Sequence, residues 1–181
     1  TKFHHLISRN RSVNLLSVAR MFLFGARDVW FVVALPVFLS SVLGWQYWQA
    51  GGFMALWVIG YGAVQVAAPV ILRGKSDPTG ATATKLAFFL ALIPAGIAAS
   101  LHANISPALV VISGLILFGI VFALNSAVHS FLILAYTDRD KVALNVGIYY
   151  MANACGRLGG TILSGWLYQT GVRHGSTGGL V

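Results

Sequence analysis

Long apolar runs alternate with short polar segments along the whole chain, and the length of each run indicates what it forms. A helix needs about 20 mostly apolar residues to cross a bilayer. Several runs reach or approach that length, interrupted by few charges. We therefore predict five membrane-spanning helices and the first residues of a sixth, at about 21–43, 51–72, 84–101, 107–134, 142–168 and 178–181.

The segments outside these runs are short. Residues 1–20 are expected to form a cytoplasmic linker, TKFHHLISRNRS, followed by the start of the first helix. The link GWQYWQ has tryptophans and a tyrosine, which suit the interface between membrane and water, and GVRHGSTGGLV near the end is typical of a loop. The chain begins at Thr1 without a recognisable signal peptide, which favours a piece of a longer protein.

Composition supports a membrane protein. Of the 181 residues, 57% are hydrophobic and 9% are charged, whereas a soluble domain has about 25% charged residues. The net charge is +8, but the basic residues gather at the ends of apolar runs and are not interleaved with exposed aromatics. This distribution argues against nucleic acid as a partner. A single cysteine, Cys155, excludes an internal disulfide.

The basic residues also predict an orientation. Connections on the cytoplasmic side of a membrane protein are enriched in Lys and Arg. Here the residues before the first span, the loop RGKSDPTGATATK and the link TDRDK are basic, whereas GWQYWQ and LHANIS have no Lys or Arg. The N-terminus is therefore expected in the cytoplasm, with the first span running outwards.

Arg27 and Asp28 stand side by side inside the first apolar run. A charge at bilayer depth costs roughly 2.5–3.5 kcal/mol, so such residues usually face a bundle interior or a water-filled cavity. Arg20 lies seven residues before Arg27 and shares its helix face. Asp28 is turned from Arg27 by about 100°. Two structural alternatives remain: Arg20 extending to the headgroups, and a purely structural cluster of Arg27 and Asp28.

The fifth run has a polar stripe with one residue in every four: Asn145, Tyr149, Asn153 and Arg157. Tyr150 lies beside this stripe, and other runs have polar residues too: Asn125, His129 and Gln65. Gathered together, these faces would line a polar cavity with excess positive charge. Guanidinium groups bind oxyanions through bidentate hydrogen bonds. The predicted ligand is therefore a polyoxyanion.

The candidate substrate-binding residues are Arg20, Arg27, Arg157, Tyr149, Tyr150, Asn153 and Asn125. Asp28 is the candidate for proton coupling or, equally, for charge pairing with Arg27. The structural alternatives are that Arg157 is only structural, that Tyr149 and Tyr150 are packing aromatics, and that His129 lies at the membrane interface.

Two further motifs stand out in the sequence. The sequence RGKS is not a phosphate-binding loop, because Pro69 occupies the position of its first glycine. Gly156 and Gly160 form a small-residue pattern that predicts close approach of a neighbouring helix. No nucleophile–base pair and no cluster of metal ligands is visible, so neither an enzyme nor a cofactor or metal site is expected.

The number of spans, the basic loop between the second and third, and the polar faces on the first, fourth and fifth resemble the C-terminal half of a major facilitator superfamily transporter. In that superfamily, two six-helix halves hold the substrate between them near the midplane of the bilayer. The resemblance implies an all-α membrane fold with five complete spans and a truncated sixth. It also implies alternating access against an N-terminal half of the same transporter.

Three stretches, GARDVWFVVALPVFL, GGFMALWVIGYGAVQVAAP and DRDKVALNVGIYYMANACGRLGGTILSG, resemble the organoarsenical efflux permeases of the ArsJ family. This resemblance implies a bacterial inner-membrane protein that exports 1-arseno-3-phosphoglycerate and confers arsenate resistance. A glyceraldehyde-3-phosphate dehydrogenase would be the functional partner that makes this arsenate ester. A carrier of trivalent arsenic would favour thiolate ligands, and one cysteine makes a poor thiolate site.

The sequence is compatible with two other functions. One is a carrier of the same superfamily for another organic anion, such as a sugar phosphate or a carboxylate. The other is a membrane subunit or fragment that does not transport.

Overall fold

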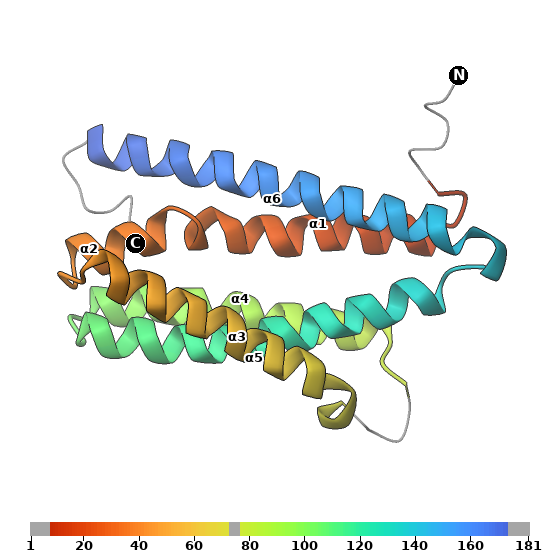
Figure 1. The fold of residues 1–181 in the computed structure, drawn as a ribbon, viewed down its shortest axis with the longest axis horizontal. Helices are drawn as coiled ribbons and strands as arrows, with labels where there is room; N and C mark the ends of the chain where they lie inside the picture. Colours follow the sequence, from red (N-terminus) through yellow and green to blue (C-terminus); the bar gives the residue numbers. More distant parts are fainter. Residues whose placement is uncertain (1–7, 73–76, 174–181) are drawn as a thin grey trace. The chain divides into compact units, whose positions relative to one another are not determined.

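The computed structural model describes residues 8–72 and 77–173, with side chains up to residue 170, and these residues form helices and no strand (Figure 1). The all-α class is therefore confirmed. In chain order the elements are α1 (Arg11–Phe31), α2 (Ala34–Ser41), α3 (Tyr47–Ile71), α4 (Gly80–His102), α5 (Pro107–Ala135), the 3-10 turn η2 (Arg139–Lys141) and α6 (Val142–Arg173).

Four stretches are long and apolar enough to cross a membrane: Arg11–Ser41, which includes α1 and α2, together with α3, α4 and α5. This is the pattern of a multi-pass membrane protein. The helix α6 is not one of the four, and its Asn145, Asn153 and Arg157 lower its hydropathy. The fifth predicted span is therefore a helix, but its passage through a membrane stays a prediction. The start of a sixth span at 178–181 lies outside the described residues.

The first helix begins at Arg11 rather than near residue 21, because Asn10 caps it. The Asn10 side chain accepts a hydrogen bond from the Ser12 amide at 2.9 Å, as N-cap residues do. The side-chain amide of Asn10 also donates, through Nδ2, to the carbonyl of Tyr136 at 2.7 Å. This bond fixes the start of α1 to the end of α5.

The predicted first span is broken into α1 and α2 at Val32–Val33. Pro36 explains the break. It lacks the N–H that would donate to the Val32 carbonyl, and its ring crowds that carbonyl.

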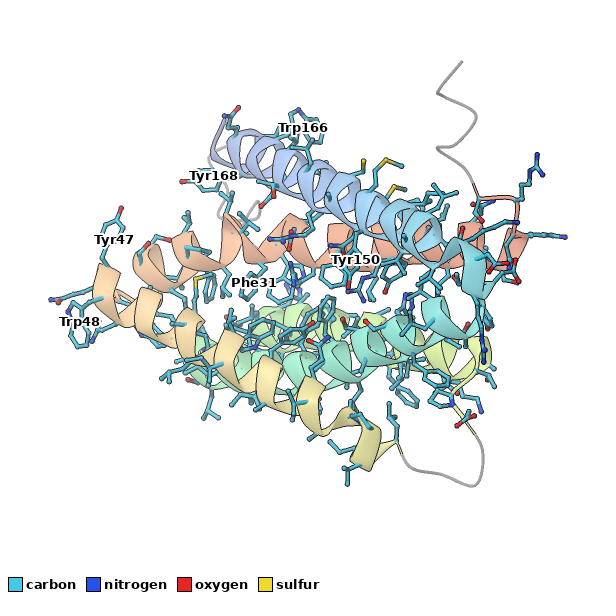
Figure 2. The ribbon with its side chains drawn as sticks, turned by 45° about the vertical axis from the view of Figure 1, so that its right-hand side comes forward. Phe31, Tyr47, Trp48, Tyr150, Trp166 and Tyr168 are labelled. Atoms are coloured by element: carbon cyan, nitrogen blue, oxygen red, sulfur yellow. The ribbon has the colours of Figure 1, made fainter. Side chains whose placement is uncertain are left out.

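Three other helix ends lie outside the predicted spans. The helix α3 takes in the second half of GWQYWQ, because the Gln49 side chain accepts from the backbone amide of Gln46 at 2.8 Å. Tyr47 and Trp48 in its first turn are exposed and project from the helix (Figure 2). Thr79 precedes α4, which includes ATATK. The helix α6 continues past residue 168 to Arg173, since a single glycine such as Gly171 weakens a helix by only about 1 kcal/mol.

A left-handed residue ends α4. Asn104 has a φ of 58°, a conformation that asparagine tolerates better than most residues. The Ile105 amide donates to the Ser100 carbonyl at 3.2 Å, and the Asn104 amide donates to Leu101 at 3.1 Å. This pair of bonds is the Schellman motif, and it sets the short turn from α4 to α5.

The described residues divide into two compact units. The first contains the chain up to Leu35 and from His129 onwards, and so includes α1, the end of α5, η2 and α6. Here α1 and α6 run parallel (Figure 1). Ser8, just before α1, donates to Asn145 in the first turn of α6 at 2.8 Å. Further along, Asp28 near the end of α1 meets Arg157 in the middle of α6.

The second unit, Pro36–Val128, contains α3, α4 and most of α5. The Trp57 indole of α3 donates to the Leu115 carbonyl of α5 at 2.7 Å. Tyr61 stacks on Trp57 at 5.9 Å between ring centroids and contacts Phe122 at 5.7 Å. Gly119 makes room for the indole, because a Cβ there would stand 3.0 Å from its nitrogen. Aromatic packing thus joins α3 to α5.

Candidate functional site

Glycines bring the backbones of α1 and α6 together. A Cβ on Gly156 would collide with the backbone of Met21, and a Cβ on Gly160 would collide with the Gly25 carbonyl. In return, a Cβ on Gly25 would stand 2.9 Å from the Gly156 carbonyl. The predicted close approach at Gly156 and Gly160 is therefore confirmed, and its partner is α1. This close approach brings the side chains of α1 and α6 on either side of the glycines within contact distance of each other.

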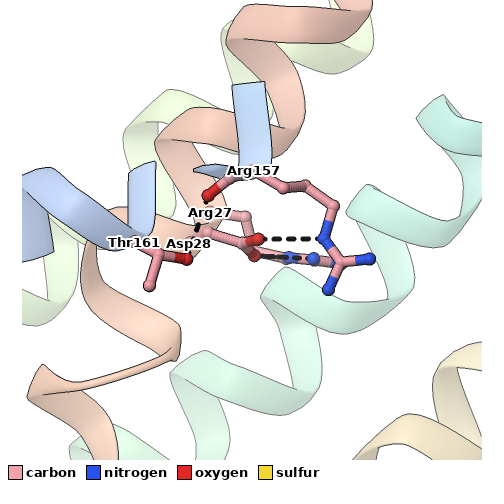
Figure 3. Close-up of polar contacts among 4 residues, drawn as sticks. All are labelled: Arg27, Asp28, Arg157 and Thr161. Atoms are coloured by element: carbon pink, nitrogen blue, oxygen red, sulfur yellow. Dashed lines mark hydrogen bonds and ion pairs between the residues drawn. The ribbon is translucent and has the colours of Figure 1, made fainter. Parts of the chain in front are cut away.

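Asp28 of α1 is held by two arginines (Figure 3). Its Oδ1 accepts from Arg27 Nε at 2.7 Å and Arg27 Nη2 at 2.6 Å, and its Oδ2 accepts from Arg157 Nε of α6 at 3.1 Å. The carboxylate side chain is only 1% exposed. A buried charge requires such partners, because losing water costs several kcal/mol. We call Arg27, Asp28 and Arg157 the Asp28 cluster.

The two arginines of the Asp28 cluster differ in environment. The side chain of Arg27 is 13% exposed, and its guanidinium lies over the rings of Phe24 and Phe31 at 4.8 and 5.9 Å. The side chain of Arg157 is 56% exposed. Two guanidiniums and one carboxylate leave the cluster with one net positive charge.

Arg20 lies in an aromatic site next to the cluster. Its guanidinium carbon is 4.0 Å from the centre of the Phe24 ring and 5.1 Å from that of Tyr149, and the residue is buried. Arg20 and Arg27 contact the same Phe24 ring, in agreement with the face that their spacing predicts. The extended, headgroup-seeking conformation weighed for Arg20 is therefore wrong. Cation–π contacts in such desolvated sites contribute about 2 kcal/mol or more.

The polar stripe of α6 faces α1 over part of its length. Tyr149 is fully buried beneath Arg20, and Asn145 is buried where it accepts from Ser8. The Asn153 Oδ1 is buried and has no hydrogen-bond partner among the described residues. Tyr150 is exposed. The binding roles predicted for Tyr149, Tyr150 and Asn153 stay predictions.

The other polar candidates lie on α3 and α5. Asn125 and Gln65 belong to the second unit, so their part in a cavity with the arginines stays a prediction. Asn125 is fully buried, and neither atom of its amide has a partner in the described part of the chain. His129 belongs to the first unit, where it is buried and interacts electrostatically with Arg20. Its place at the membrane interface stays a prediction.

Several contacts of the site were not predicted. Phe24 and Phe31 support the arginines, although Phe24 stands four residues after Arg20 and Phe31 four after Arg27, a spacing that brings helical side chains together. The Thr161 hydroxyl donates to the Arg157 carbonyl at 2.9 Å (Figure 3).

Two pockets lie in the second unit, and both are lined mainly by apolar residues. One, of about 590 Å³, lies between α4 and α5 around Gly96 and Gly114. The other, of about 440 Å³, lies between α3 and α5 around Gly60 and Gly119. Neither lining contains a charged residue, so neither offers what a polyoxyanion requires.

The geometry of the first unit thus provides three guanidiniums near one buried carboxylate. No protein-family model matches the sequence, and no curated protein or solved structure matches it either. The resemblance to facilitator transporters therefore rests on the span pattern, and the resemblance to organoarsenical permeases on the stretches quoted above.

Proposed function

We propose that this chain is part of a membrane transporter that exports an organic polyoxyanion by alternating access. The observation that carries the proposal is the Asp28 cluster: arginines from α1 and α6 meet at one buried carboxylate and leave a net positive charge. A structural ion pair needs only one guanidinium for one carboxylate. An anion with several oxygens would neutralise the surplus charge.

The proposed substrate is 1-arseno-3-phosphoglycerate, and the proposed consequence is arsenate resistance. This choice comes from the resemblance to organoarsenical efflux permeases. The chemistry supports it, because arsenate and phosphate groups present oxygens that guanidiniums bind in pairs. The transporter would act in the inner membrane of a bacterium, together with an N-terminal half and a glyceraldehyde-3-phosphate dehydrogenase. It would carry out no reaction itself.

The test is arsenate resistance in an arsenic-sensitive bacterium that expresses the full-length protein with and without the dehydrogenase. Resistance and lowered cell arsenic are expected only when both proteins are present. Resistance should fall with Arg157→Gln, whereas Arg139→Gln in the exposed turn η2 is the matched control. If the protein reaches the membrane but gives no resistance, the substrate is another organic anion or the chain does not transport. Competition by sugar phosphates and carboxylates in a vesicle uptake assay then separates these two outcomes.

Charge pairing is the role we propose for Asp28, because both of its oxygens are engaged by arginines. Proton coupling would require the carboxylate to release at least one of them. Transport by Asp28→Asn should therefore keep the pH dependence of the wild type. A pH profile that becomes flat in this variant would instead assign Asp28 to coupling.

A further inference from the structure

We infer that the two arginines of the Asp28 cluster have different tasks: Arg157 contacts the anion, Asp28 positions Arg157, and Arg27 is the counter-charge of Asp28. This inference rests on the anion site of the proposed function, and it assigns a separate role to each residue of that site.

Arg27 is committed to Asp28. A guanidinium has one edge formed by Nε and one Nη, and another formed by the two Nη atoms. Arg27 directs both atoms of its Nε edge to the single oxygen Oδ1, at 2.7 and 2.6 Å. Its side chain is largely buried, and its guanidinium lies over Phe24 and Phe31. A ligand would have to displace these contacts to reach it.

Arg157 is bound at one atom only. Its Nε donates to Asp28 Oδ2 at 3.1 Å, and its two Nη atoms have no hydrogen-bond partner among the described residues. More than half of this side chain is exposed. The free edge therefore carries two parallel N–H groups that match two oxygens of one phosphate, arsenate or carboxylate group. Asp28 fixes the orientation of that edge without using it.

The charges lead to the same assignment. Arg27 and Asp28 form the shorter contacts and together are neutral. The charge of Arg157 is then the net charge of the cluster, and it stands on the exposed side chain. An incoming anion meets an oriented guanidinium whose charge is not already cancelled. A lysine at the same place would keep the charge but lose the pair of parallel N–H donors.

A matched pair of conservative substitutions tests this division. The full-length protein in lipid nanodiscs is titrated calorimetrically with 3-phosphoglycerate and with inorganic arsenate. Arg157→Lys is expected to weaken binding by about 10-fold or more, the cost of losing a charged hydrogen bond. Arg27→Lys keeps the counter-charge and is expected to weaken binding less than Arg157→Lys does. Equal losses in the two variants, or no binding of either probe by the wild type, would overturn the inference.

The positioning role of Asp28 needs a readout that a general loss of stability would not give. Asp28→Asn should weaken binding in the wild-type background but not in Arg157→Lys, because the edge that Asp28 orients is already lost there. Such non-additivity is the signature of residues that act as a unit. Independent, additive losses would show that Asp28 does not act through Arg157.

A measurement on the unmutated protein avoids any problem of folding. Phenylglyoxal modifies accessible guanidiniums, and mass spectrometry locates the modified residue. Arg157 should react and be protected by 3-phosphoglycerate, whereas Arg27 should stay unmodified in both conditions. Protection of Arg27 in place of Arg157 would reverse the assignment.

The outcomes also separate this inference from the proposed function. If cells become arsenate-resistant but Arg157→Lys binds the probes normally, the function stands and the division of labour fails. If the asymmetry between the two arginines is found without arsenate resistance, the division stands and the proposed substrate fails.

Discussion

Gly160 of α6 lies directly against Asp28 of α1: a Cβ at position 160 would stand 3.1 Å from the Cβ of Asp28 and would collide with the Gly25 carbonyl. The absence of a side chain at Gly160 thus lets α1 approach closely enough for Asp28 to meet Arg157.

Gly160→Ala should therefore destabilise the first unit. Overpacking of a close contact costs about 1–3 kcal/mol, and the shift of α1 should also lengthen the Asp28–Arg157 contact. Gly159→Ala is the control, because no atom lies within 4 Å of a Cβ there and alanine favours a helix by about 0.5–1 kcal/mol over glycine. Thermal unfolding of the purified protein in detergent should show a lower midpoint for Gly160→Ala alone. Equal midpoints would mean that the two backbones are not in contact.

Removing Asp28 should be more harmful than removing Asp28 together with Arg27. Asp28→Asn leaves the largely buried Arg27 without its counter-charge, and breaking a buried ion pair costs about 3–5 kcal/mol. The double variant Arg27→Gln with Asp28→Asn buries no unpaired charge at these positions, so its unfolding midpoint should lie above that of Asp28→Asn. A double variant that loses the sum of both single effects would contradict the pairing.

Phe24 should contribute more to the free energy of unfolding than its buried area alone predicts, because its ring contacts both Arg20 and Arg27. Phe24→Leu removes two cation–π contacts, each of about 0.5–2 kcal/mol. The matched control is Phe22→Leu on the same helix, where the side chain is 66% exposed. Thermal unfolding should rank Phe24→Leu well below Phe22→Leu, while Phe24→Tyr, which keeps the ring, should stay near the wild type. Similar midpoints for the two leucine variants would show that the Phe24 ring does not stabilise the arginines.

The predicted orientation can be tested with single cysteines in a Cys155→Ser background. Ala103→Cys lies in the exposed turn between α4 and α5, and Asp140→Cys lies in the exposed turn η2. Because the basic link TDRDK is expected in the cytoplasm, an impermeant maleimide should label position 103 on intact spheroplasts and position 140 only after lysis. The opposite result would invert the topology.

The helices could be predicted from hydrophobic runs, because burial in a bilayer imposes a length on each of them. Their ends depended on local hydrogen bonds. Asn10 starts α1 earlier than hydropathy suggests, and Pro36 breaks the helix that hydropathy makes continuous. Hydropathy averages over many residues and does not detect a single cap or a single missing amide.

For the candidate site, periodicity predicted which residues share a helix face but not which partners they contact. A spacing of seven places Arg20 and Arg27 on one face, as the shared Phe24 ring shows. It does not indicate that Arg20 is enclosed by aromatic rings while Arg157 stays exposed. Those differences come from contacts between α1 and α6, which lie far apart in sequence, and from side-chain conformations that a helical pattern does not specify.

The adjacency of Arg27 and Asp28 has a consequence for the synthesis of the protein. Asp28 precedes Arg157 by 129 residues, so at usual rates of translation α1 exists for on the order of ten seconds before α6 is made. During that interval the carboxylate already has its counter-ion on the neighbouring residue, so Asp28 can enter the bilayer without being an unpaired charge. When α6 arrives, its arginine finds a carboxylate that is already in place. The order of residues in α1 therefore protects the nascent chain at the stage when its later helix is still missing.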